Sequence, residues 1–162
     1  MNIMQHYKEL TFSAVVSDVC SRFANNKALG YAGEGQMTYA ELGENIKAIQ
    51  YFLETMAIKP GDKVAIYSQN MPNWGAVYFT LQCMGVIAVP ILPDFNTTEL
   101  QNVLEHSETD TIFVSKNLEH RMSEISYDGL NNIIRLDDFE LIKSTKELVA
   151  FDTNAKSDKT YT

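Results

Sequence analysis

Two short apolar runs in the middle of the chain indicate buried strands. Residues 64–67 read Val-Ala-Ile-Tyr and residues 86–89 read Val-Ile-Ala-Val, and turn-forming residues bound both runs. Uninterrupted apolar runs of this length are typical of strands that are covered on both faces. Apolar residues at helical spacing lie between them, so the pattern predicts a strand, a helix and a second, parallel strand in one sheet.

The helix between these strands is expected to be apolar on most of its surface. Asn70 offers a side-chain oxygen to the first free amides, Pro72 suits the first turn, and Gly85 suits a left-handed helix end. The residues at helical spacing are Trp74, Val77, Tyr78, Leu81 and Met84, and Ala76, Phe79 and Cys83 make the other sides apolar. We therefore expect neighbours to cover this helix on most sides.

Further helices are predicted before and after this unit. Residues 11–24 carry one apolar stripe, and residues 42–56 carry another on a helix that a capping box opens. The predicted helix starts are Thr11, Thr38 with Glu41, and Asn96 with Glu99. Residues 117–126 and 137–147 show weaker helical patterns.

Short apolar segments elsewhere complete the predicted sheet. They are residues 28–32, 36–37, 111–114 and 132–136. Strands followed by helices at intervals of roughly 20 residues are typical of α/β proteins. The prediction is an α/β layered fold with a mostly parallel sheet and helices on both faces.

The chain divides into one folded unit and a short tail. Residues 1–150 are predicted to form the α/β unit. Residues 151–162 are polar and aperiodic, and we expect them to form a frayed connector without helix or strand.

Charge and length exclude several classes of protein. The 162 residues carry a formal net charge of −8, which opposes general binding to nucleic acid or to an anionic membrane. No apolar run reaches the ~20 residues that a transmembrane helix needs. Residues 1–9 lack the apolar core of a signal peptide, so we expect a cytoplasmic protein. Cys20 and Cys83 lie in apolar helical patterns and are expected to be buried free thiols.

Three collinear segments carry a resemblance to a known family. The first is MTYAEL at residues 37–42. The second is residues 61–95, which contain GDKVAI, N-x-P-x-W and GVIAVPILP. The third is NTTELQNVLEHSETDTIFVS at residues 96–115. Together they resemble the N-terminal region of the AMP-forming acyl-CoA synthetases, which belong to the adenylate-forming enzymes. The resemblance covers roughly half of the chain, and a collinear block of this length is far more specific than a short motif.

The resemblance implies a ligase that uses ATP, magnesium and coenzyme A. Such an enzyme converts a carboxylic acid to an acyl-adenylate and then to a coenzyme A thioester. The run VPILPDFNTTEL at residues 89–100 favours the branch that acts on long- or medium-chain fatty acids.

In that family a phosphate-binding loop of the type YTSGTTG follows a polar connector like residues 151–162. The adenine- and ribose-binding segments and a mobile domain with the catalytic lysine lie further on. We therefore expect no catalytic, cofactor-binding or metal-binding residue in this chain, no ATP binding by this piece alone, and a Ser/Thr/Gly-rich loop within about fifteen residues after Thr162. Asn70, Pro72, Trp74 and Pro90 match the family pattern, and we interpret them as scaffold.

Several motifs are better explained by structure than by chemistry. Residues 33–35 read Gly-Glu-Gly, which lacks the spacing of a dinucleotide loop and favours a hairpin turn. The three histidines are scattered without metal-ligand spacing and are expected to be solvated; they are His6, His106 and His120. Asp137 and Asp138 are interpreted as the cap of a helix rather than as a cation site.

Three further features have a structural and a functional interpretation. Trp74 is expected to pack in the core rather than to stack on a nucleotide base. Ser144 and Thr145 show no nucleophile context and are interpreted as helix surface. The apolar stripes of residues 11–24 and 42–56 are expected to pack on the sheet rather than on a membrane.

Two other classes of function stay open at this point. The chain could be a stand-alone, flavodoxin-like module that binds a small ligand at the carboxyl ends of its strands. It could instead be an assembly domain that forms a homodimer through an exposed apolar face. In the ligase hypothesis its partners are the remainder of the same polypeptide and a carboxylic acid substrate.

Overall fold

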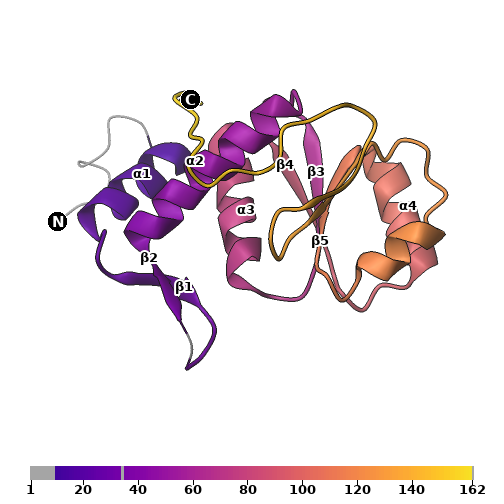
Figure 1. The fold of residues 1–162 in the computed structure, drawn as a ribbon, viewed down its shortest axis with the longest axis horizontal. Helices are drawn as coiled ribbons and strands as arrows, with labels where there is room; N and C mark the ends of the chain where they lie inside the picture. Colours follow the sequence, from indigo (N-terminus) through magenta and orange to yellow (C-terminus); the bar gives the residue numbers. More distant parts are fainter. Residues whose placement is uncertain (1–9, 34, 162) are drawn as a thin grey trace.

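A five-stranded sheet forms the centre of the part of the chain that the computed structural model describes, residues 10–33 and 35–161 (Figure 1). The strand order is β4-β3-β5-β6-β7. The strands are β3 (Lys63–Tyr67), β4 (Ile87–Ile91), β5 (Thr111–Val114), β6 (Asn132–Arg135) and β7 (Leu141–Ser144). All neighbours pair in parallel except β6 and β7, which are antiparallel. The predicted mostly parallel sheet is confirmed.

Helices cover both faces of this sheet because side chains alternate along each strand. Val64 and Ile66 belong to one core cluster, with α2 (Tyr39–Thr55) and α3 (Pro72–Met84). Ala65 and Tyr67 belong to a second cluster, with α4 (Thr97–Ser107) and the 3-10 helix η2 (Glu119–Glu124). A strand that is apolar at every position therefore serves two cores at once.

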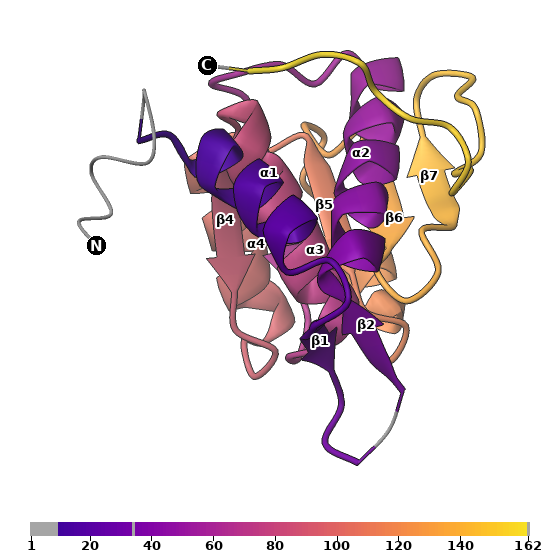
Figure 2. The same ribbon diagram turned by 90° about the vertical axis from the view of Figure 1, so that its left-hand side faces the viewer.

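An outer layer lies on α2 and α3 (Figure 2). Helix α1 (Phe12–Arg22) packs on both of them. β1 (Lys27–Gly30) and β2 (Gln36–Thr38) pair as an antiparallel hairpin, and residue 34 of the predicted turn lies outside the described residues. α1 contains no fully buried residue, but Val16 and Cys20 pack against the core from its inner side. The apolar stripe of α1 thus packs on helices rather than on the sheet, so the predicted packing of residues 11–24 on the sheet is wrong.

The predicted caps are confirmed at three helices and wrong at one. Thr38 with Glu41, and Asn96 with Glu99, form complete capping boxes, and the Thr11 side chain accepts from Ala14 N at 3.2 Å. Helix α3 instead has Met71 at its N-cap without a side-chain hydrogen bond. Pro72 follows at once and lacks an N–H to satisfy, so this helix start depends less on a cap.

The predicted helix over residues 137–147 is wrong. The segment is a tight connection followed by strand β7, which pairs with β6. Asp138 Oδ1 accepts from Glu140 N at 3.1 Å, and Phe139 has a φ of 60°. This local turn reverses the chain, and cross-strand pairing then outweighs a weak helical pattern. The weak helix predicted at residues 117–126 is present only as the 3-10 turn η2.

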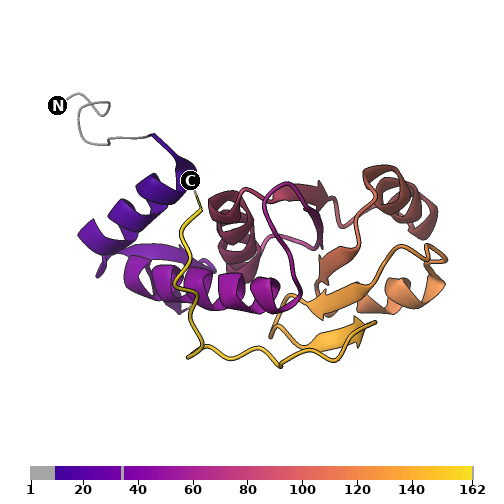
Figure 3. The ribbon, with the colours of Figure 1, turned by 90° about the horizontal axis from the view of Figure 1, so that it is seen from above.

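The last described residues are not frayed, contrary to the prediction. Residues 151–161 form no helix or strand, but they run across α2 (Figures 2 and 3). Phe151 contacts Phe52 and Phe139 with ring centroids 5.6 and 4.5 Å apart. Ser157 is buried and its N–H donates to Lys47 O at 3.2 Å. Tertiary contacts that a polar composition does not reveal hold this segment in place.

Within the described ranges, no helix has the length and apolar character required to cross a bilayer.

Helix α2 faces the sheet with the residues that the sequence pattern assigned inward, and Ile49 and Leu53 are fully buried.

Candidate functional site

The carboxyl ends of the parallel strands meet at one edge of the sheet. The chain passes from β3 to β4 on one side and then returns to β5 on the other side of β3. Ligand sites in open α/β sheets lie at such reversal points. This edge is therefore the first place to search for a site.

Polar residues that follow β3 and β5 contact one another at this reversal point. The Ser115 hydroxyl lies 3.2 Å from Gln69 Oε1 and 2.8 Å from Asn117 Oδ1. Ser115 N donates to Tyr67 O at 3.2 Å, which continues the ladder between the strands. Ser115 is buried, whereas Gln69 and Asn117 are exposed, so this cluster lies where the sheet edge meets the surface.

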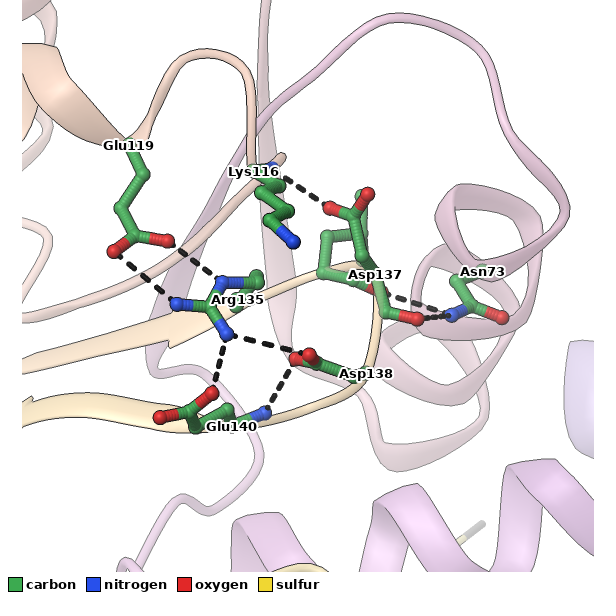
Figure 4. A network of polar contacts seen from close by, with 8 residues as sticks. Asn73, Lys116, Glu119, Arg135, Asp137, Asp138 and Glu140 are labelled. Atoms are coloured by element: carbon green, nitrogen blue, oxygen red, sulfur yellow. Dashed lines mark hydrogen bonds and ion pairs between the residues drawn. The ribbon is translucent and has the colours of Figure 1, made fainter.

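An arginine at the end of β6 is surrounded by three carboxylates (Figure 4). Arg135 contacts Glu119 through Nε at 2.7 Å and through Nη2 at 3.3 Å, and it also contacts Asp138 and Glu140. The hydrogen bond to Glu119, more than the other carboxylates, raises the pKa of Arg135 above its ordinary value. The guanidinium is thus occupied by the protein's own acids, which disfavours an anion site at this position.

The acidic pair after β6 joins three elements rather than capping a helix. Asp137 Oδ2 accepts from Lys116 N at 2.7 Å. The Asn73 side chain, in the first turn of α3, donates to Leu136 O at 2.9 Å and to Asp137 O at 3.0 Å (Figure 4). The cap interpretation of this pair is wrong, because no helix follows.

A second arginine closes the other end of the same edge. Arg121 Nη1 donates to the Tyr67 hydroxyl and to the carbonyl oxygens of Pro93 and Phe95. The Tyr67 hydroxyl itself donates to Phe95 O at 2.8 Å. These bonds hold the loop between β4 and α4 against the sheet. Sequence reasoning missed both arginines. The partners of Arg121 lie 26 to 54 residues away along the chain, whereas two of the three carboxylates around Arg135 lie in the adjacent turn that the pattern assigned to a helix.

The remaining candidate residues lie at separate places in the fold. Trp74 packs against the core while partly exposed, and it stacks on Tyr78 at 5.2 Å between ring centroids. The Ser144 hydroxyl ends β7 and donates to Asn132 Oδ1 at 2.9 Å, so the helix-surface interpretation is wrong. His106 and His120 are exposed, and His6 lies outside the described residues. Across the described ranges, no three His, Cys, Asp or Glu side chains form a potential metal cluster.

A groove of about 1070 Å³ lies between α1, α2 and the segment from Lys156 to Tyr161. Cys20 and Cys83 contribute to its lining, and neither is in a disulfide. Burial, with a smaller effect of the Cys20 thiol, raises the pKa of Cys83 to about 11. Burial also raises the pKa of Cys20. Both thiols are protonated near neutral pH, which makes them poor nucleophiles.

One carboxylate contacts several residues that line this groove. Glu54, in the last turn of α2, accepts hydrogen bonds from Gln50, Ser157 and Tyr161 and lies 3.6 Å from Lys159 Nζ. Burial by itself raises the pKa of Glu54, but these hydrogen bonds and the Lys159 charge together bring the pKa below its ordinary value.

These features define the class of protein. The chain belongs to the AMP-binding enzyme family, whose model matches residues 16–160. Its matched relatives are adenylate-forming ligases, and the predicted resemblance is confirmed.

The individual relatives are similar over only part of their length. The chain is 27% identical over 106 residues to the long-chain-fatty-acid–CoA ligase of Escherichia coli, covering 65% of this chain and 19% of that protein. It is 27% identical over 85 residues to 3-[(3aS,4S,7aS)-7a-methyl-1,5-dioxo-octahydro-1H-inden-4-yl]propanoyl:CoA ligase of Rhodococcus jostii, covering 52% of this chain and 16% of that protein. The chain thus spans less than a fifth of the length of these curated relatives.

Solved structures show the same fold at low identity. A putative long-chain-fatty-acid CoA ligase from Rhodopseudomonas palustris has a TM-score of 0.75 at 18% identity, covering 96% of this chain and 38% of that one. The N-terminal subdomain of NpsA from Klebsiella oxytoca, in complex with anthranilyl-AMSN, has a TM-score of 0.67 at 16% identity, covering 85% of this chain and 34% of that one. The α/β unit therefore has the fold of the N-terminal subdomain of adenylate-forming enzymes.

Proposed function

We propose that this chain is the N-terminal part of an ATP-dependent, AMP-forming ligase that joins a carboxylic acid, of the fatty-acid class, to coenzyme A. The family match over residues 16–160 carries the proposal. The long-chain-fatty-acid–CoA ligase relative and the run VPILPDFNTTEL support a fatty acid as the substrate.

The proposed reaction has two balanced steps. The acid's carboxylate attacks the α-phosphate of ATP, which gives an acyl-adenylate and pyrophosphate. The thiol of coenzyme A then attacks the acyl carbon, forming the thioester and releasing AMP. Magnesium and a lysine would stabilise the charge in the first step, and the lysine and the residues that would hold magnesium are expected in the part of the enzyme beyond these residues.

The role of these residues in that enzyme is structural support. The polar groups at the carboxyl edge are engaged with one another: Arg135 with three carboxylates, Asp137 with Lys116 N, and Arg121 with the β4–α4 loop. Few of these groups are left to hold a triphosphate. We therefore propose that this piece alone is inactive and binds neither ATP nor acyl-CoA with useful affinity, and that the enzyme works in the cytoplasm.

Calorimetric titration with ATP and magnesium tests this assignment. The isolated chain should show no heat change that indicates ATP binding with a micromolar Kd. The polypeptide extended by its own downstream coding sequence should form pyrophosphate when a fatty acid is added. Micromolar ATP binding or turnover by the isolated chain would contradict the scaffold role. A downstream sequence without a Ser/Thr/Gly-rich loop would contradict the ligase.

The strand order β4-β3-β5-β6 favours one other candidate, a flavodoxin-like module that binds a small ligand at the reversal point. Absorption spectra of the purified chain separate the two proposals. A chromophore that stays bound through gel filtration would favour the module.

Exposed apolar side chains allow a homodimer as a further possibility. Leu10 and Phe12 are 60% and 42% exposed, and Ile87 on the edge strand β4 is 50% exposed. Such surface invites association. Light scattering of this chain beside the extended polypeptide tests whether a dimer forms and whether the extension changes it.

A further inference from the structure

The carboxylate of Glu54 holds three residues of the C-terminal segment. The Ser157 hydroxyl lies 2.8 and 2.9 Å from the two carboxylate oxygens, and the Tyr161 hydroxyl donates to Oε1 at 3.0 Å. Lys159 Nζ lies 3.6 Å from Oε2. The Glu54 side chain is only 10% exposed.

Gln50, one turn earlier on α2, uses its side chain to contact a side chain and a backbone carbonyl of the same segment. Its Nε2 lies 2.9 Å from Ser157 Oγ, 2.9 Å from Lys159 O and 3.1 Å from Glu54 Oε1. Gln50 is 7% exposed and Ser157 is 8% exposed. The contact is therefore a buried polar cluster between elements that are more than 100 residues apart in sequence.

Two more contacts extend the attachment along α2. Ser157 N donates to Lys47 O at 3.2 Å, and Lys156 Nζ donates to Glu44 O at 3.1 Å. The groove of α1 and α2 lies beside this segment, and Lys156, Ser157 and Tyr161 line it.

The segment and the carboxylate depend on each other for physical reasons. A largely buried carboxylate is costly unless hydrogen bonds and an opposite charge compensate it. Apart from Gln50, the groups that compensate Glu54 all come from residues 157–161. The segment in turn has no helix or strand to order it, so these polar contacts determine its path together with the packing of Phe151 and Tyr161 on the core.

We propose that Glu54 is a positioning residue that fixes the direction in which the chain leaves this unit at Tyr161. By fixing that direction, Glu54 determines the position in space from which the polypeptide after Tyr161 continues. This inference rests on the proposed function, in which the phosphate-binding loop follows that point. Glu54 would then govern the placement of the ATP-binding loop without touching the nucleotide.

The first experiment measures the attachment in this chain itself. Hydrogen exchange of the Ser157 and Lys159 amides is compared between the parent chain and Glu54→Ala, Glu54→Gln and Tyr161→Phe. Loss of hydrogen bonds to a charged group should speed exchange about tenfold to a hundredfold in Glu54→Ala. Glu54→Gln keeps the acceptor and loses the charge, so its exchange should be intermediate.

Glu44→Gln is the matched control. Glu44 lies on the same helix and pairs with Lys156 at 3.4 Å, but its side chain is 57% exposed. Exchange in this variant should change less than about twofold, as expected for an exposed ion pair. Unchanged exchange in both Glu54→Gln and Tyr161→Phe would overturn the proposal, even if Glu54→Ala failed to fold.

The second experiment uses the extended polypeptide with ligase activity. Glu54→Gln should raise the KM for ATP about tenfold while changing the KM for the acid less than about twofold, and Glu44→Gln should change neither. A loosened segment with an unchanged KM for ATP would overturn the positioning role. Absence of ligase activity in the parent polypeptide would instead defeat the proposed function, and the exchange result on this chain would still stand.

Discussion

Buried polar atoms in this protein are matched individually with partners. Among the residues that the structure describes, no buried side-chain nitrogen or oxygen lacks a hydrogen bond. Thr80 donates to Ala76 O at 2.8 Å inside α3, and Asn132 donates to Thr111 Oγ1 at 3.0 Å between strands. An unmatched buried polar group costs about 1–3 kcal/mol, so this matching contributes to the choice of one structure.

Gly85 provides a test at the residue scale. It ends α3 with a φ of 68°, and an added Cβ would lie 3.5 Å from Pro60 Cβ, an ordinary contact. In Gly85→Ala the only cost should be the left-handed backbone conformation, which should lower the free energy of unfolding by about 1–2 kcal/mol. Urea denaturation measures the change.

Gly35→Ala is the control for this substitution. No heavy atom lies within 4 Å of an added Cβ at Gly35, and its φ is outside the left-handed range. The free energy of unfolding should be unchanged or rise by up to about 1 kcal/mol, because alanine restricts the unfolded chain. Equal losses of unfolding free energy in Gly85→Ala and Gly35→Ala would contradict a specific cost of the left-handed backbone at Gly85.

At the scale of elements, the sequence predicted those that local chemistry determines. The strands β3 and β5 and the starts of α2 and α4 follow from apolar runs and capping boxes. Strand β7 was missed because it depends on pairing with β6, and a local helical pattern obscured it. Likewise, Glu54 gave no signal, since all its partners except Gln50 lie more than 100 residues later.

The capping box of α2 is testable on its own. Glu41 N donates to Thr38 Oγ1 at 3.2 Å, and Thr38 N donates to Glu41 Oε2 at 2.7 Å. Thr38→Ala removes the first bond and should lower the free energy of unfolding by about 1 kcal/mol. Thr38→Ser keeps the hydroxyl and should lose less than about half of that. Urea denaturation with circular dichroism follows both variants, and identical losses would refute the cap.

The attachment of residues 157–161 should weaken at both low and high pH. The folded pKa of Glu54 is lowered, so its contribution is full above roughly pH 4.3, the unfolded value, and is lost as pH falls through the folded pKa. Burial, followed by the hydrogen bond to Glu54, raises the pKa of Tyr161. Its contribution is full below about pH 10 and is lost as pH rises through the folded pKa.

Lys159 and Tyr161 from the segment face Glu54, and Gln50 and Ser157 contribute uncharged groups. Amide exchange at Ser157 and Lys159, corrected for intrinsic rates, should show protection between these limits and a loss beyond each. Glu54→Gln should abolish the acidic limit. A protection profile that keeps its acidic limit in this variant would refute the role of Glu54.

On the scale of the whole molecule, two cores share one sheet. Leu53 on α2 belongs to one core and Leu104 on α4 to the other, and both are fully buried. Because β3, β5 and β6 contribute side chains to both clusters, loss of one core should destabilise the other. The layered architecture followed from the sequence, whereas the anchoring of residues 151–161 required the three-dimensional arrangement.

Leu53→Ala and Leu104→Ala test this coupling. Each should lower the free energy of unfolding by about 2–5 kcal/mol, and each should show one transition in which Trp74 fluorescence and circular dichroism coincide. Leu92→Ala is the control, because Leu92 is 64% exposed, and its effect should stay within about 0.5 kcal/mol. Separate transitions for the two probes would show that the cores unfold independently.

The distance along the chain between Gln50 and Ser157 has a consequence for biosynthesis. These contacting residues are 107 positions apart. At a translation rate of about 5–20 residues per second, α2 emerges from the ribosome roughly 5–20 s before its partner segment. The Glu54 carboxylate therefore cannot gain its hydrogen bonds from Ser157 and Tyr161 until that segment has emerged.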